Sequence, residues 1–158
     1  TNMSIVSKYE GTDRGYIVRY RSADDKLQWF QRNSANTTTN TWLTDAAFFV
    51  SGDIGNWVHV VYAGAQNGTG TFYKNGVRVA TTKSNSETTV GDLPAPFHIG
   101  AFGTPSNYFD GMIDETAVWS KVLTEGEVRA LYGYGTPPPY LAPAGGGATD
   151  NALAMCNF

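Results

Sequence analysis

The sequence predicts an all-β protein built as a two-layer antiparallel sandwich, and three observations support that prediction. Only 16% of the 158 residues are charged whereas 18 are glycines, a composition that suits short strands joined by turns. Apolar side chains recur at every second position along much of the chain, which is the periodicity of half-buried strands. Asn75 and Gly76 separate two such alternating runs and are typical of the tight turn of a β-hairpin.

The individual strands are predicted from these alternating runs. Residues 16–22 and 26–32 alternate on either side of a polar turn, so we expect them to pair as a hairpin. Residues 33–45 are rich in Asn and Thr and predict a loop or an edge strand. The further predicted strands lie within residues 46–50, 56–64, 70–82, 96–102 and 108–120, which brings the total to about ten.

A short helix and a linker-like tail follow the last predicted strand. Thr124 and Glu127 have the spacing of a capping box, which predicts a helix of about two turns that ends at Gly133. We therefore place the sandwich domain in residues 1–135. Residues 136–158 carry a proline run and a glycine triplet, the composition of an extended linker. We expect this tail to dock on its own domain or on a neighbouring chain.

Charge and cysteine content exclude several classes of protein. The net charge is −3, and basic residues are interleaved with acidic ones, so there is no footprint for nucleic acid or for an anionic membrane. No apolar run approaches the length of a membrane span, and we expect no membrane insertion. Cys156 is the only cysteine, which excludes an internal disulfide and a thiolate metal cluster.

Five motifs follow one another in the order found in a known family. They are "NWVHVVYAG" (56–64), "FYKNGVRVA" (72–80), "FHIGAF" (97–102), "FDGMIDETAVW" (109–119) and "LTEGEVRALYG" (123–133). In this order they resemble the laminin G-like, concanavalin A-like lectin and glucanase domains. The resemblance runs from Trp57 to Gly133 and more weakly back to Ile5. It implies a jelly-roll sandwich in which Trp57 and Trp119 occupy core positions.

The resemblance implies a non-catalytic, lectin-like recognition module that binds glycans or other cell-surface ligands and is secreted or displayed on a cell or a virion. The alternative is a structural or assembly module of a surface appendage or virus particle, acting through contacts with neighbouring copies or other subunits. Such domains usually open with two strands that are missing before residues 4–11. Those strands either lie upstream in a longer protein or are replaced by the tail or a neighbour's strand, because an exposed sheet edge needs cover.

Catalysis is the least supported class of function. Glucanases of this fold carry facing carboxylates on one strand, and here Asp110 and Asp114 share a face of the predicted strand. The third acidic residue that would complete the set is missing. His59 and His98 lie inside predicted strands and are interpreted as structural histidines rather than as general bases. We therefore expect no enzyme activity.

Two sets of candidate site residues remain. Sugar binding needs exposed aromatic rings for stacking and amides for the hydroxyl groups. The candidate ligand-binding residues are Trp42, Asn56, Asn107 and Tyr108. Many laminin G-like domains hold calcium at the loop rim, which needs about six to eight oxygen ligands. The candidate calcium donors are Asp53, Asp110 and Asp114, although Asp53 could instead accept hydrogen bonds from backbone amides of its own loop.

Overall fold

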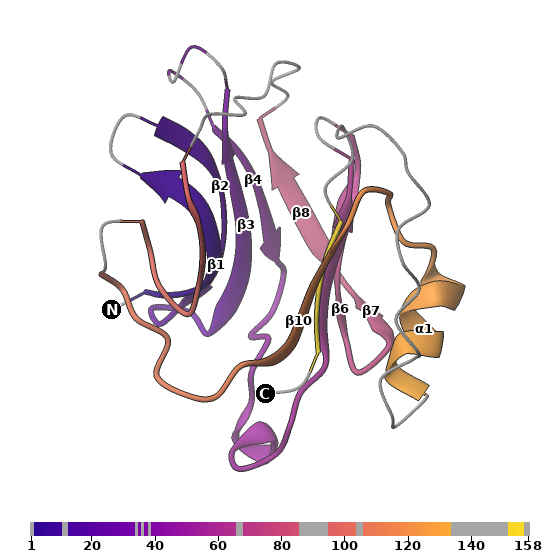
Figure 1. Ribbon diagram of the computed structural model, residues 1–158. Helices are drawn as coiled ribbons and strands as arrows, with labels where there is room; N and C mark the ends of the chain where they lie inside the picture. The colour runs from indigo at the N-terminus through magenta and orange to yellow at the C-terminus, as the bar shows by residue number, and fades with distance from the viewer. Residues whose placement is uncertain are drawn as a thin grey trace.

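The protein folds into two antiparallel sheets that face each other across a hydrophobic core (Figure 1). The computed structural model describes residues 2–10, 13–33, 35, 37, 39–65, 68–85, 95–103, 106–133 and 152–156. The first sheet has the strand order β8 (Thr81–Ser84), β4 (Thr39–Thr44), β3 (Lys26–Arg32), β2 (Asp13–Arg21), β1 (Met3–Glu10) and β9 (Phe97–Ile99). The second has the order β10 (Asp114–Trp119), β11 (Ala152–Cys156), β5 (Val60–Gly64), β6 (Gly70–Lys74) and β7 (Val77–Val79).

Two short helices complete the described part of the chain. The 3-10 helix η1 (Ser51–Asp53) lies in the loop before β5, and the α-helix α1 (Glu125–Gly133) follows β10. The two sheets and the single α-helix confirm the predicted all-β jelly-roll sandwich.

The core between the sheets is rich in aromatic rings. Trp29 from β3 stacks on Tyr62 from β5, with ring centroids 4.4 Å apart and an angle of 6° between the planes. Trp42 from β4 meets the same tyrosine edge-on at 6.1 Å, and Phe72 from β6 lies 5.1 Å from it. Each buried aromatic side chain removes a large apolar area from water, worth about 25 cal/mol per Å². These rings therefore hold the two sheets together.

Both predicted hairpins form. β2 and β3 pair in the antiparallel register that sets Arg21 opposite Lys26. β6 and β7 are joined by a two-residue turn in which Asn75 has φ 50° and Gly76 has φ 76°. Positive φ at both central residues is the mark of the type I′ turn that Asn-Gly predicts. The run that was predicted to continue β7 instead changes sheet after Ala80, and β8 pairs with β4 in the first sheet.

Three predicted strands differ from the structure. Residues 46–50 form bends rather than a strand, with Phe48 buried and Val50 exposed. β4 was predicted as a loop or an edge strand but lies between β3 and β8, so both its edges are paired. Within residues 108–120 a strand forms only as β10, because Asp110 and Gly111 lie in a bend.

α1 covers the outer face of the second sheet. The predicted capping box forms, since Glu127 N–H donates to Thr124 Oγ1 at 3.3 Å and Thr124 N–H donates to Glu127 Oε2 at 2.8 Å. The helix buries Val128 in a second apolar cluster that includes Val61 of β5, and Trp119 packs against this cluster. Trp119, expected in the core, is thus partly buried between the second sheet and the helix. The helix ends at Gly133, as predicted.

The C-terminal strand β11 lies between β5 and β10 and is antiparallel to both. Its register sets Cys156 opposite Asp114 on one side and Leu153 opposite Tyr62 on the other. The predicted domain boundary at residue 135 lies outside the described residues, so the division into a domain and a tail remains a prediction.

Candidate ligand-binding groove

At one end of the sandwich the loop that contains η1 faces the segment before β10 (Figure 1). Side chains from both segments line a groove there. Its volume is about 450 Å³. We call it the rim groove, and it is lined by Met3, Tyr20, Phe49, Val50, Asp53, Ile54, Gly55, Asn56, Trp57, Val58, Phe109, Asp110, Gly111 and Met112. Most of these side chains are apolar. The polar groups are two carboxylates, one amide and the hydroxyl of Tyr20, which donates a hydrogen bond to Asp25. The groove can therefore take a ligand that combines an apolar face with hydrogen-bonding groups.

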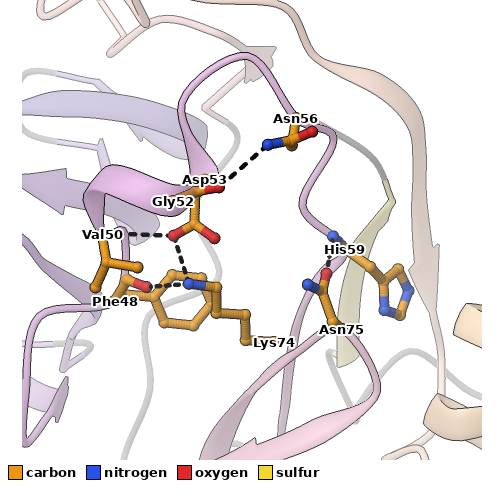
Figure 2. A network of polar contacts seen from close by, with 8 residues as sticks. All are labelled: Phe48, Val50, Gly52, Asp53, Asn56, His59, Lys74 and Asn75. Carbon is orange, nitrogen blue, oxygen red and sulfur yellow. Dashed lines mark hydrogen bonds and ion pairs between the residues drawn. The ribbon is translucent and has the colours of Figure 1, made fainter.

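Asp53 belongs to the lining of the rim groove, and Figure 2 shows the polar contacts that hold its side chain. Its Oδ2 accepts a hydrogen bond from Val50 N–H at 2.7 Å and lies 2.5 Å from Lys74 Nζ. Lys74 Nζ also donates to Phe48 O at 2.8 Å. Burial by itself raises the pKa of Asp53, but the hydrogen bonds from Lys74 and Val50 and the charge of Lys74 outweigh it and lower that pKa. Asp53 is thus held as a carboxylate.

Two asparagines fix this part of the chain: Asn56 closes the loop on itself, and Asn75 joins the following segment to the β6–β7 turn (Figure 2). Asn56 Nδ2 donates to Gly52 O at 3.1 Å, which leaves its side-chain oxygen to accept a hydrogen bond from a ligand. Asn75 Oδ1 accepts from the backbone N–H of His59, and Asn75 N–H donates back to His59 O, both at 2.9 Å. The β6–β7 turn therefore holds the backbone close to Trp57.

Trp57 lines the rim groove and is 48% exposed, so the expectation that it is a core residue was wrong. Pairing of β5 begins at Val60, and Trp57 lies in the loop before the strand. Ile54 and Met112, which come from the two facing loops, are more exposed still. An exposed indole beside an amide gives the groove a flat face on which a ring can stack.

The four predicted ligand-binding residues lie in different places. Asn56 lines the rim groove. Trp42 does not reach the surface, because β4 is an interior strand: it is 1% exposed, and its ring packs between Tyr62 and the ammonium group of Lys83. The interpretation of Trp42 as an exposed loop residue was therefore wrong.

Asn107 and Tyr108 lie in an exposed loop but do not line the groove. Asn107 has φ 48° and accepts a hydrogen bond from Ser4 N–H through its backbone carbonyl at 2.9 Å. Tyr108 is 62% exposed. It directly precedes Phe109, which lines the groove, but is not itself part of the lining. Trp57 is the residue that sequence reasoning missed, although the Gly- and Asp-containing loop before it was a usable signal.

The three predicted calcium donors do not come together as a set. Asp53 and Asp110 both line the rim groove, but Asp53 is already paired with Lys74. Asp114 begins β10 and does not line the groove; its Oδ1 accepts a hydrogen bond from Glu115 N–H at 2.8 Å. In the described part of the chain, no group of three His, Cys, Asp or Glu side chains is arranged to hold a metal ion. These residues therefore do not fit the oxygen-rich shell that calcium needs.

The pair of strand carboxylates expected of a glucanase is not formed. The common strand face predicted for Asp110 and Asp114 is not formed, because Asp110 lies in a bend. The lowered pKa of Asp53 is the opposite of what a proton donor to a leaving group requires. His59 lies away from the groove lining and is 2% exposed; its ring stacks on Tyr132 of α1 at 5.7 Å, and burial lowers its pKa. This histidine is structural.

An antiparallel sandwich with a groove at its loop rim is the architecture of a ligand-binding module. Residues 1–129 match the laminin G-like family described as the concanavalin A-like lectin/glucanases superfamily. Since the match covers most of the sequence, the chain belongs to this superfamily, as the motifs indicated. Comparisons with curated proteins and with solved structures gave no significant match.

Membership of the superfamily defines the general role. Its domains are carbohydrate- or ligand-binding modules that are generally non-catalytic, although the superfamily includes glucanases, and laminin G-like domains are typically extracellular. Among the described residues, no helix has the length and hydrophobicity needed to cross a membrane.

Proposed function

We propose that this chain is a lectin-like recognition module that binds glycans in the rim groove, outside the cell or on the surface of a particle. The observation that carries the proposal is the half-exposed indole of Trp57 in a groove that also offers Asn56 and Asp110. Sugar rings present a C–H face that packs on an aromatic ring, and their hydroxyl groups need hydrogen-bond partners. The groove supplies both kinds of contact, and the chain acts by binding without catalysis.

The charges in the groove narrow the class of glycan. Lys74 is already engaged by Asp53 and by Phe48 O, so it does not offer its charge to an anionic ligand. Asp110 is exposed in the groove and adds a negative charge. A sugar that carries carboxylate or sulfate would be repelled there, whereas a neutral glycan would donate hydrogen bonds from its hydroxyl groups to the carboxylate. The proposed ligand is therefore a neutral glycan.

A glycan array probed with the full chain tests the proposal, followed by titration of a bound glycan. The Trp57→Ala variant is expected to weaken binding about tenfold, because it removes the stacking face. Tyr108→Ala is the matched control, since it removes an exposed aromatic side chain outside the groove and is expected to leave affinity unchanged. No binding across the array, or equal losses in both variants, would contradict glycan recognition at this groove.

A second candidate function is that of an assembly module of a surface appendage or a virus particle. The observation that favours it is β11, a strand from the far C-terminal end that lies between two strands distant from it in sequence. Deletion of residues 136–158 tests this role in the parent assembly. Loss of the oligomer or particle is expected, and an unchanged assembly would reject the role.

A further inference from the structure

β10 is attached to the second sheet through β11. In the described residues β10 pairs with β11 alone, and β5 pairs with β11 on one side and with β6 on the other. Neighbouring strands lie about 4.8 Å apart, so removal of β11 would leave β5 and β10 separated by roughly twice that distance. Both strands would then present unpaired N–H and C=O groups. The space between them is a strand-binding site, which we call the β5–β10 slot.

The strand that fills the slot is remote along the chain from the strands on either side. Eighteen residues, 134–151, separate the end of α1 at Gly133 from Ala152. A segment of that length can span up to about 60 Å when extended, whereas a domain of this size has a radius of gyration of about 15 Å. The connection is therefore long enough for β11 to reach the slot of its own domain or the slot of an adjacent copy.

We propose that the β5–β10 slot also takes the β11 strand of a second copy of this chain, so that crowded copies join by exchanging C-terminal strands. A strand from another copy makes the same backbone hydrogen bonds in the same register as the chain's own strand. The form that holds its own β11 and the form that holds the β11 of a second copy therefore make the same contacts and differ only in which chain the strand belongs to. A tethered strand has an effective concentration of the order of millimolar, so exchange prevails when copies are crowded to that level, as on a surface.

This inference deepens the assembly role proposed above, on which it rests, and does not depend on glycan recognition. The slot is formed by strand edges of the second sheet, whereas the rim groove is formed by loops together with Met3 and Tyr20 of the first sheet. A chain without glycan affinity could still exchange strands, and a monomeric chain could still bind a glycan. The two proposals are tested by different readouts and can fail separately.

Cys156, the only cysteine of the chain, permits a direct test because its register partner is Asp114. Directly opposed residues of a regular antiparallel pair have Cα atoms about 4.5–5.5 Å apart, within the range that a disulfide spans. The Asp114–Cys156 pair lies beside an irregularity of the ladder, whereas Val118 and Leu153 are opposed in its regular part. In the full-length Asp114→Cys variant, oxidation should therefore link positions 114 and 156. After refolding at about 1 µM the link is expected within one chain, and after refolding at about 1 mM it is expected between chains. Mass spectrometry of the non-reduced peptides identifies the link and its partners.

Two controls keep the result interpretable. Thr82→Cys places an exposed thiol on β8, away from the slot, and is expected to give no specific link to Cys156 at either concentration. A second design, Val118→Cys with Leu153→Cys and Cys156→Ser, tests another opposed pair if the first variant folds poorly. Links confined to single chains at about 1 mM, or between-chain links equally frequent in the Thr82→Cys control, would overturn strand exchange. Absence of the 114–156 and 118–153 links would overturn the slot itself.

Discussion

Lys74 Nζ lies 2.5 Å from Asp53 Oδ2, and this ion pair joins β6 to the loop that forms a wall of the rim groove. The same ammonium group donates to Phe48 O, so one side chain holds the loop at two points. The side chains of Lys74 and Asp53 are 21% and 16% exposed, which limits the competition from water. The pair therefore contributes more to stability than an ion pair on the open surface.

Replacement of Lys74 by methionine should release this loop. We expect Lys74→Met to lower the free energy of unfolding by about 1–3 kcal/mol, because Asp53 and Phe48 O lose a charged donor in a poorly hydrated place. Urea denaturation measures the change, and glycan affinity should fall with it. Arg129→Met is the matched control, since its pair with Glu125 is mostly exposed and should cost less than about 0.5 kcal/mol. Equal losses in the two variants would show that Lys74 does not anchor the loop.

His59 should make stability depend on pH near neutrality. Burial lowers the pKa of His59 below its ordinary value of 6.5, so the unfolded chain binds this proton more readily than the folded one. Stability from the neutral ring is then complete above pH 6.5 and is lost as the pH falls below it towards the folded pKa. Denaturation at several pH values should show this slope. His59→Gln should flatten this slope, and a slope that survives in His59→Gln would refute the assignment.

The capping box should stabilise α1 measurably. Thr124→Ala removes the acceptor for Glu127 N–H and is expected to lower the free energy of unfolding by about 1 kcal/mol.

The hydrogen bond from Lys121, with those from Thr124, lowers the pKa of Glu127 to about 2. The contribution of the Glu127 carboxylate to stability is therefore complete above its ordinary pKa of 4.5 and is lost as the pH falls towards 2. Denaturant midpoints measured at several pH values between 4.5 and about 2 test this loss of stability. A midpoint in Thr124→Ala equal to that of the parent chain would show that the cap is dispensable.

Local patterns were sufficient for the fold class, the two hairpins and the helix. The Asn75–Gly76 turn and the Thr124 cap depend on chemistry within a few residues, so sequence predicts them well. The position of β11 depends on pairing with β5 and β10, which lie far away along the chain. The proline- and glycine-rich sequence that precedes β11 contains no local pattern that predicts this pairing.

The candidate site was predicted less well, for a physical reason that two tryptophans illustrate. Polar neighbours suggested an exposed ring at Trp42, but β4 is an interior strand, and Asn40 and Thr44 are buried on the same face as this indole. Trp57 follows the alternation of β5, but pairing starts only at Val60 and leaves this indole at the rim. Periodicity shows which residues share a face, but it does not show where pairing begins or which strands are interior.

Thermal unfolding with and without calcium tests whether the loops at the rim groove bind this ion. An ion bound at a hundredfold excess over its Kd would stabilise the fold by about 2.7 kcal/mol, a rise in Tm of several degrees for a domain of this size. Because Asp53 is paired with Lys74 and Asp114 lies outside the groove, we expect the Tm to be the same in millimolar calcium and in chelator to within about 1 °C. Thermal unfolding followed by circular dichroism measures both. A calcium-dependent rise that Asp110→Asn abolishes and Asp114→Asn preserves would instead show that the rim groove completes its coordination shell around Asp110.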